Sequence, residues 1–282
     1  LGYLLENRIT IGRQFPNAFN AMKVQRLGAS YKALMQGLRA LSPKGADARI
    51  ALLTPGPYNE TYFEHAYLAR YLGLPLVEGN DLTVRDQRVY LKTLHGLEPV
   101  DVLIKRLGDE WLDPLELRSE SALGVPGLMQ AVRAGHVMLA NAPGSAPLES
   151  SAMLGFLPAI SRHLLGEELH LSSLPTWWCG EAASLADGLH RLERSVVKRT
   201  YPRTSSETEI GPMLDPKAMA KLRERIRDQP DQYTLQSYLP LSQQPTWREG
   251  EIVPRAAMLR VFALCDGPQS WRVLPGDRKS VV

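Results

Sequence analysis

Glu64 and His65 place a carboxylate beside an imidazole, a combination that can bind an amine or act as acid and base. They follow an apolar run that stops at residues 54–57, Thr-Pro-Gly-Pro. We expect a helix over residues 59–72 with Asn59 as its N-cap, and the first amides of such a helix can hold an anion. The alternative is a plain strand-to-helix turn with a hydrogen-bonded histidine, which is the more common case for these residue types.

Three further places carry residues suited to charged ligands. Arg106 and Asp109 follow a predicted strand at 100–105 and could grip a charged substrate, although such residues more often lie in a solvated loop. Lys198 lies at the end of a β-branched run before a polar loop, where its ammonium group could meet a phosphate; ordinary strand-end lysines are commoner. Arg260 lies among apolar residues, and a buried guanidinium there requires an anion, either a ligand phosphate or an internal carboxylate.

The elements around these residues alternate between strand and helix. Strands are expected at residues 49–53, 74–78, 100–105 and 137–140. With helices between them, this spacing predicts an α/β fold with a doubly wound, mostly parallel sheet. Ligands bind beyond the carboxyl ends of the strands in such sheets, so the turns that follow these strands should form one ligand-binding rim.

Other elements are expected on both sides of this sheet. Residues 3–41 repeat apolar side chains every three to four positions and should be mainly helical. A hairpin is expected at 82–92, and a helix within 115–134, at least after Pro126. Beyond residue 150 the pattern changes to α+β, with helices at 153–164, 182–192 and 216–228, strands at 195–198, 233–239, 258–264 and 270–274, and a loop at 177–180.

The composition excludes several classes of protein. Of the 282 residues, 44% are apolar and 22% charged, which is typical of a globular protein with a sizeable core. The net charge is only +3 and no run of Lys and Arg could follow a phosphate backbone, so nucleic acid is not expected. Cys179 and Cys265 lie far apart without metal-ligand spacing, which favours free thiols in the cytoplasm. No membrane span or signal peptide is expected, and a homo-oligomer remains open.

Both ends of the chain read as the interior of a longer protein. The chain begins LGYLLENR, without an initiator methionine, and stops six residues after a predicted strand and turn at 273–276. We therefore expect this chain to be a piece of a longer protein.

Several stretches are characteristic when taken together: LLENR (4–8), LLTPGPYNETYFEHAYLARYLG (52–73), LVEGNDLTVRD (76–86), DPLELRSESALGVPGL (113–128), TWWCG (176–180) and LRVF (259–262). In this order they resemble the circularly permuted ATP-grasp proteins of type 2, bacterial relatives of glutathionylspermidine synthetase. The resemblance covers nearly the whole chain. It implies an N-terminal helical segment at 1–45, a pre-ATP-grasp substrate-side α/β domain at 46–149, and a partial ATP-grasp nucleotide lid and core at 150–282.

The resemblance implies an ATP-dependent carboxylate–amine ligase, in which ATP phosphorylates a carboxylate and an amine then attacks the acyl phosphate. The two substrates would be small or peptide-like molecules. By resemblance, Lys198 would contact the nucleotide phosphates, and Arg260 would face the phosphates as a catalytic residue. The strand around Gln236, Tyr238 and Leu239 would border the adenine.

The acceptor substrate would face the residues around Asn59, Glu64 and His65, with Arg106 and Asp109 as further substrate-binding residues. Circular permutation would place the acidic Mg²⁺ ligands before Leu1, so we expect no metal ligands in this segment and no catalysis by it alone. The loop at 199–205 also lacks the glycine that relatives carry, so its backbone could approach a phosphate less closely. Three hypotheses stay open: part of an active ligase, a degenerate ATP-grasp scaffold, and a small-molecule-binding α/β module.

Overall fold

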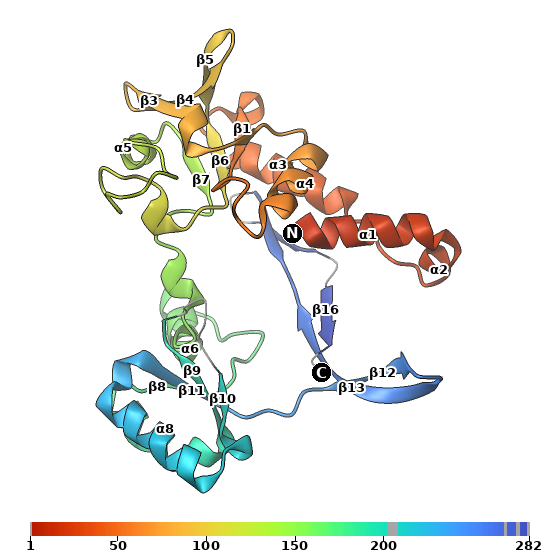
Figure 1. The fold of residues 1–282 in the computed structure, drawn as a ribbon, viewed down its shortest axis with the longest axis vertical. Helices are drawn as coiled ribbons and strands as arrows, with labels where there is room; N and C mark the ends of the chain where they lie inside the picture. The colour runs from red at the N-terminus through yellow and green to blue at the C-terminus, as the bar shows by residue number, and fades with distance from the viewer. Residues whose placement is uncertain (1, 202–207, 268–269, 275–276, 281–282) are drawn as a thin grey trace. The chain divides into compact units, whose positions relative to one another are not determined.

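The computed structural model describes residues 2–201, 208–267, 270–274 and 277–280 (Figure 1). Contacts divide the chain into two compact units. Unit 1 comprises Leu1–Pro143 and Ser242–Val282, and unit 2 comprises Gly144–Leu241. The division into segments 1–45, 46–149 and 150–282 concerns roles within a family, and it stays a prediction.

A four-stranded parallel sheet forms the centre of unit 1. Its strands are β1 (Ile50–Leu53), β2 (Leu76–Val77), β6 (Val102–Lys105) and β7 (Met138–Ala140). Their order is β2-β1-β6-β7, and every neighbouring pair is parallel. Because the chain moves from β1 outward to β2 and later returns to the other side of β1, the order reverses between β1 and β6. The mixed α/β class expected from the alternation is confirmed.

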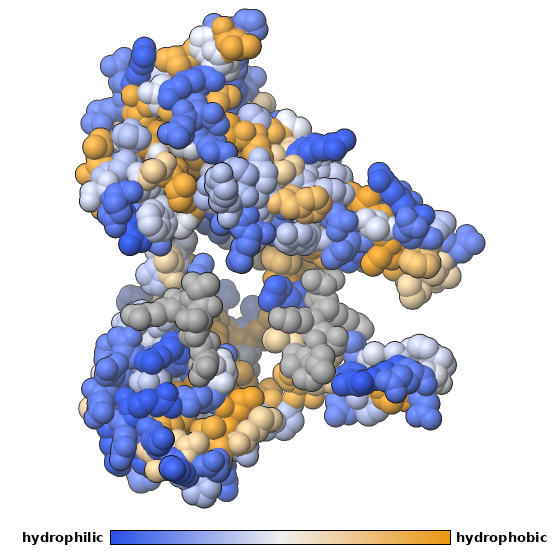
Figure 2. Space-filling model, in the orientation of Figure 1, coloured by the Kyte–Doolittle hydropathy of each residue, from blue (hydrophilic) through white to orange (hydrophobic). Residues whose placement is uncertain are grey.

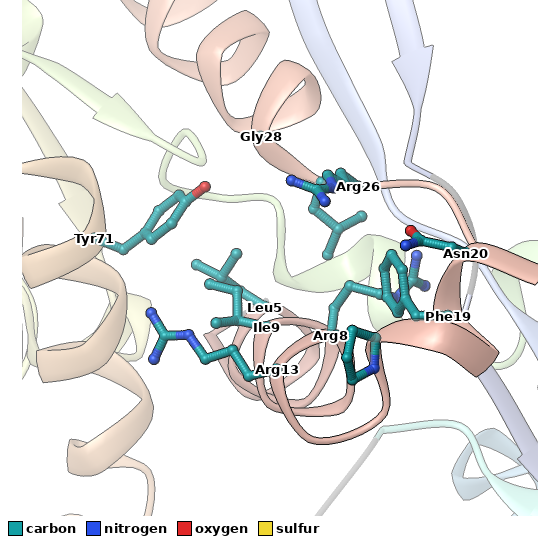
Figure 3. Close-up of a pocket in the computed structure, with 12 residues that line it drawn as sticks. Leu5, Arg8, Ile9, Arg13, Phe19, Asn20, Arg26, Gly28 and Tyr71 are labelled. Carbon is teal, nitrogen blue, oxygen red and sulfur yellow. The ribbon is translucent and has the colours of Figure 1, made fainter. Parts of the chain in front are cut away.

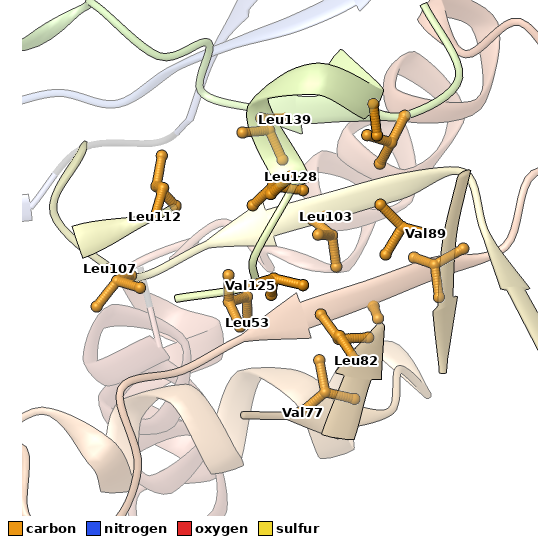
Figure 4. Close-up of a cluster of buried hydrophobic side chains, with 14 residues drawn as sticks. Leu53, Val77, Leu82, Val89, Leu103, Leu107, Leu112, Val125, Leu128 and Leu139 are labelled. Atoms are coloured by element: carbon orange, nitrogen blue, oxygen red, sulfur yellow. The ribbon is translucent and has the colours of Figure 1, made fainter. Parts of the chain in front are cut away.

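Helices lie on both faces of this sheet because β1 is apolar on both sides. On one face Ala51 and Leu53 pack in a cluster with Leu103 and Leu128 (Figure 4), and α5 (Leu128–Arg133) supplies part of it. On the other face Leu52 joins a cluster with residues of the remaining helices. These helices are α1 (Gly2–Gln14), α3 (Gly28–Leu41) and α4 (Tyr62–Leu72), while the short α2 (Pro16–Ala21) follows α1.

The rest of unit 1 consists of antiparallel strands. One sheet contains β3 (Leu82–Arg85), β4 (Arg88–Thr93) and β5 (Gly96–Val100), so the expected hairpin has a third strand. The C-terminal strands are β12 (Gln243–Arg248), β13 (Glu251–Arg260), β14 (Ala263–Gly267), β15 (Ser270–Val273) and β16 (Asp277–Ser280). β14 packs closely on α3, where a Cβ added at Gly37 would overlap the carbonyl oxygen of Cys265.

Unit 2 is an antiparallel sheet covered by helices. Its strands are β8 (Thr176–Trp178), β9 (Ser195–Arg199), β10 (Glu209–Ile210) and β11 (Tyr233–Ser237), in the order β10-β9-β11-β8. Its helices are α6 (Met153–Leu165), α7 (Ala182–His190) and α8 (Pro216–Asp228). The side chain of Asp215 caps α8 by accepting a hydrogen bond from the amide of Ala218. Leu222 and Ile226 of α8 pack against Val197 and Leu235 of the sheet.

Short 3₁₀ helices connect many of these elements, at Gly45–Asp47, Gly79–Asp81, Asp109–Trp111, Ala146–Glu149, Leu192–Arg194, Gly211–Met213 and Pro230–Gln232. Polar residues cover most of the face of each unit drawn in Figure 2. Among the described residues, no helix has the length and apolar character that a bilayer crossing requires.

Three expected elements are wrong in type or extent. The helix within 115–134 is only the six residues of α5, because residues 121–127 form a loop held by tight backbone packing at Gly124. The loop at 177–180 begins as strand β8, since its aromatic residues pair with β11. The single strand at 258–264 is divided between β13 and β14.

Candidate functional site

The carboxyl ends of β1 and β6 form the first candidate site, in unit 1. Leu53 and Lys105 are paired across these strands, and the amide of Arg106 donates a 2.8 Å hydrogen bond to the carbonyl of Leu53. Thr54 and Arg106 therefore leave the sheet side by side. This is the point where the strand order reverses, which is where doubly wound sheets bind ligands.

His65 is the centre of a hydrogen-bonded chain at this rim. Its Nε2 lies 3.1 Å from the hydroxyl of Thr61, and its Nδ1 lies 3.0 Å from the hydroxyl of Thr54. The Thr61 hydroxyl donates to the side-chain oxygen of Asn59 at 2.6 Å, and the Thr54 hydroxyl accepts from the amide of Gly56 at 3.3 Å. We infer that Nε2 carries the proton and donates to Thr61, while Nδ1 accepts from Thr54.

Burial and a neighbouring charge favour the neutral form of the imidazole. Only 3% of His65 is exposed, and burial together with the positive charge of Arg106 lowers its pKa below the ordinary value for histidine. Because both ring nitrogens already have partners, His65 holds the turn in place and offers no free nitrogen to a ligand. Of the two interpretations of this residue, the geometry favours the hydrogen-bonded histidine.

Glu64 lies beside His65 and is bound to Arg106. Its Oε1 lies 3.0 Å from a terminal nitrogen of Arg106 and accepts a 2.9 Å hydrogen bond from the amide of Gly2. The two charged side chains are largely buried, with 14% of Glu64 and 26% of Arg106 exposed. Burial opposes ionisation of Glu64, but hydrogen bonds to its carboxylate, one of them from the Gly2 amide, and the positive charge of Arg106 lower its pKa.

A second ion pair lies on the same turn. Lys105 contacts Asp109 at 2.5 Å, and both side chains are mostly buried. The Nε group of Arg106 is buried, and within the described part of the chain it has no hydrogen-bond partner. A buried donor without a partner is costly unless a ligand or water completes it, so the Nε group of Arg106 marks a polar position at this rim that the described residues leave unsatisfied.

Asn59 is not the N-cap of α4, which corrects the expected start of that helix. The helix begins at Tyr62, with Thr61 in the N-cap position. Asn59 instead closes a turn, because its side-chain oxygen accepts bonds from both the amide and the hydroxyl of Thr61. The helix does not begin at Asn59 because the asparagine side chain competes well for nearby backbone donors.

The second candidate site is a hollow of about 420 Å³ in unit 2. It is lined by Leu148, Glu149, Ser150, Ser151, Leu154, Lys198, Arg199, Thr208 and Gln236. Lys198 pairs with Thr234 across β9 and β11, and Gln236 pairs with Val196, so Lys198 and Gln236 share one face of the sheet. Two predicted nucleotide-binding residues are therefore brought together.

Lys198 differs from its neighbour Arg199 in having no partner among the residues that the structure describes. Within the described ranges no carboxylate lies at ion-pair distance from the Lys198 ammonium group, whereas the Arg199 guanidinium stacks on the Tyr233 ring at 4.4 Å. The hydroxyls of Ser150 and Ser151 donate to the backbone carbonyls of Thr200 and Arg199, which ties the wall of the hollow to β9. The hollow thus presents a half-buried cation to a ligand.

The remaining predicted residues lie elsewhere. Tyr238 and Leu239 follow β11 and are exposed, and neither lines the hollow. Arg260 is the last residue of β13 in unit 1, and it is exposed. Its expected burial is wrong because β13 belongs to an exposed ribbon in which Arg260 pairs with Asp277 through the backbone. Most of the polar loop after Lys198 lies outside the described residues.

Sequence reasoning missed several residues of both sites. Thr54 and Thr61 occupy the two nitrogens of His65, and Lys105 pairs with Asp109. The four-residue spacings from Thr61 to His65 and from Lys105 to Asp109 were the available signals. Ser150 and Ser151 had no comparable signal, since they reach β9 across some 48 to 50 residues of chain.

Among the described residues, no group of three or more His, Cys, Asp or Glu side chains could hold a metal ion. Where the magnesium ligands implied by the resemblance lie stays a prediction. Burial raises the pKa of the Cys179 thiol to about 12, which keeps it protonated and unreactive at neutral pH.

The fold defines the class as an α/β protein with two candidate sites, a charged rim on a parallel sheet and a lysine-bearing hollow on an antiparallel sheet. Comparison with known families then identifies it. Residues 1–278 match the family model "Circularly permuted ATP-grasp type 2", and the chain belongs to that family.

Proteins of several bacteria are similar to this chain in sequence. An uncharacterized protein of Mycobacterium bovis is 37% identical over 277 residues, which is 98% of this chain and 50% of the relative. An uncharacterized protein of Synechocystis sp. is 36% identical over 277 residues, covering 98% of this chain and 57% of the relative. The chain therefore spans about half the length of these curated relatives.

Solved structures give weaker likenesses. A glutathione synthetase-like effector from Globodera pallida in its apo form has a TM-score of 0.45 at 14% identity, over 83% of this chain and 51% of that one. The ATP-grasp ligase PsnB, complexed with a minimal precursor, has a TM-score of 0.43 at 11% identity, over 84% of this chain and 77% of that one.

Proposed function

We propose that this chain is part of an ATP-dependent carboxylate–amine ligase. ATP would transfer its terminal phosphoryl group to a substrate carboxylate, and an amine would then displace phosphate from the acyl phosphate to form the C–N bond. Membership of the ATP-grasp family supports this reaction class. The observation that carries the proposal is the hollow of unit 2, where the Lys198 ammonium group has no carboxylate partner among the described residues.

In this proposal the hollow would take the phosphates of ATP. Lys198 would balance their negative charge, and a charge-assisted hydrogen bond from a half-buried ammonium group is a strong contact. Gln236 is 3% exposed and already donates to the Thr176 hydroxyl at 3.4 Å, so its part would be to shape the edge of the hollow. Tyr238, Leu239 and Arg260 stay as predicted nucleotide residues. The expected magnesium ligands would have to come from outside the described residues.

The rim of unit 1 would take the other substrates. Arg106 has an Nε donor to spare, and it could hold the carboxylate of a small or peptide-like molecule. Glu64 and Asp109 would place negative charge near an incoming amine, while Asn59 and His65 would hold the turn that carries them. We also propose that the protein acts in the cytoplasm, since both cysteines are free thiols.

Binding of Mg-ATP to the full-length protein, measured by calorimetry, tests the nucleotide part. We expect Lys198→Ala to weaken binding by about tenfold or more, because it removes a charged hydrogen-bond donor. Lys217→Ala is the matched control, because Lys217 is an exposed lysine of α8 that does not line the hollow. Equal weakening by both variants would contradict a specific role for Lys198.

A second candidate is a degenerate ATP-grasp scaffold that binds ligands without catalysis. The observation in its favour is the loop at 199–205, which contains no glycine. If the full-length protein binds no Mg-ATP at all, while its fold is intact by circular dichroism, the scaffold replaces the ligase.

A further inference from the structure

A separate cavity in unit 1 lies between the N-terminal helices, away from the ends of the parallel strands. Its volume is about 460 Å³. Typical small-molecule sites enclose about 300–1,000 Å³, so the cavity has the size of a ligand site. Its walls come from α1, from α2, from residues 26–28 at the start of α3, and from Tyr71 near the end of α4 (Figure 3).

The base of the cavity is apolar. Leu5 and Ile9 come from α1, Phe19 from α2, and Leu27 from the residue before α3. Leu5, Phe19 and Leu27 are buried, with exposed fractions of 1%, 6% and 2%. An apolar ligand body placed against these side chains would be removed from water, which favours binding.

The border of the cavity is positively charged. Arg8, Arg13 and Arg26 line it, and the lining contains no Asp or Glu. Within the described part of the chain, none of these three arginines forms an ion pair. Arg8 donates to the carbonyl of Gln25 at 2.5 Å, while Arg13 and Arg26 are exposed. Their guanidinium groups are thus available for a carboxylate or phosphate, which they can bind through two hydrogen bonds.

From the apolar base and the cationic border together, we propose that this cavity binds a small amphiphilic anion: a carboxylate or phosphate monoester with a compact apolar body. The apolar body would lie on Leu5, Ile9 and Phe19. The head group would lie between Arg13 and Arg26, with Arg8 nearby. This inference is independent of the proposed ligase activity, since none of these residues belongs to the rim or to the hollow.

The test uses the full-length protein and matched eight-carbon probes in calorimetry. We expect octanoate or octyl phosphate to bind at one site per chain, and the tighter of the two identifies the head group. Octanol has the apolar body without the charge, and acetate and inorganic phosphate have the charge without the body. Each of these should bind at least about tenfold more weakly. The proposal is overturned if neither amphiphilic probe binds, or if any of the three controls binds as tightly.

Variants of the border locate the site. Arg13→Gln and Arg26→Gln should each weaken the tighter probe by about tenfold, and higher salt should weaken it further. Arg39→Gln is the matched control, because Arg39 is an exposed arginine of α3 that does not line the cavity. Arg13 and Arg26 are both exposed, so the melting temperatures of these variants should equal that of the wild type. Unaltered affinity in the double variant of Arg13 and Arg26 would refute the proposal.

Discussion

The rim of unit 1 and the hollow of unit 2 treat their charged groups in opposite ways. At the rim, Glu64 is paired with Arg106 and Asp109 with Lys105, and both nitrogens of His65 are hydrogen-bonded. In the hollow, Lys198 has no ion-pair partner among the described residues. Charged groups that satisfy one another hold a fixed geometry, whereas a half-buried cation without such a partner is a candidate for binding an anion.

The sequence pattern suggested that Glu64 and His65 bind a substrate, whereas in the structure both side chains form contacts within the rim. The residues around TPGPYNETYFEH build a hydrogen-bonded turn, and Arg106 is the residue of this rim that we propose to bind a ligand. The four predictions below test the contrast through peptide-resolved hydrogen exchange, which reports the stability of residues 49–73 and of residues 195–237 separately.

The largest effect is expected from His65→Leu. The substitution removes the imidazole partner of the buried Thr54 hydroxyl, and an unsatisfied buried group costs about 1–3 kcal/mol. It also removes one of the two partners of the half-buried Thr61 hydroxyl, which keeps Asn59. We expect the opening free energy of residues 49–73 to fall by about 3 kcal/mol. His95→Leu, at an exposed position, is the control and should change little. Protection that is unaltered by His65→Leu would show that the network does not hold the turn.

Gly56→Ala should lower the opening free energy of residues 49–73 by about 2 kcal/mol. Gly56 has φ of +99°, and a Cβ there would lie 3.2 Å from the carboxyl carbon of Glu78. Gly73 also has positive φ, at +68°, but a Cβ there would meet nothing within 4 Å. Gly73→Ala should therefore cost only the conformational part, about 1 kcal/mol. Equal losses in the two variants would remove the contact with Glu78 from the explanation.

The rim should also lose stability in acid. The pKa of His65 is lower in the folded protein than in the unfolded chain, so between these two values the unfolded chain binds more protons. The contribution of His65 to the free energy of unfolding is therefore complete above the unfolded pKa of about 6.5. This contribution is lost as the pH falls through the folded pKa. The slope is at most about 1.4 kcal/mol per pH unit for one proton. Exchange at pH 7.5 and 5.0, corrected for intrinsic rates, should reveal a smaller pH dependence in His65→Leu than in the wild type.

The smallest effect on stability is expected from Lys198→Ala. Because Lys198 has no ion-pair partner within the described residues, its removal should change the opening free energy of residues 195–237 by less than about 0.5 kcal/mol. A loss of 2 kcal/mol or more would mean that Lys198 stabilises unit 2, and the contrast with the rim would fail. If Lys198→Ala leaves the stability unchanged but weakens ATP binding, the result would support the contrast between the rim and the hollow.

Much of the fold could be predicted from local pattern. The central strands, the N-terminal helices and the helix at Pro216–Asp228 were expected at or near their observed positions, because burial imposes regular apolar spacing. The misses occur where a side chain or a tertiary contact overrode local propensity. Asn59 closes a turn that delays α4, tight packing at Gly124 keeps residues 121–127 from joining α5, and β8 forms only because β11 lies beside it.

The sequence by itself determined the alternation of elements, the family membership and the residue types at the strand ends, since these depend on order along the chain. Only the tertiary structure decided which charges are paired. Arg106 meets Glu64 across 42 residues, and the wall of the hollow reaches β9 across nearly 50. It also decided that His65 is neutral and that Arg260 is exposed, because hydrogen bonding and burial depend on neighbours that the fold alone brings together.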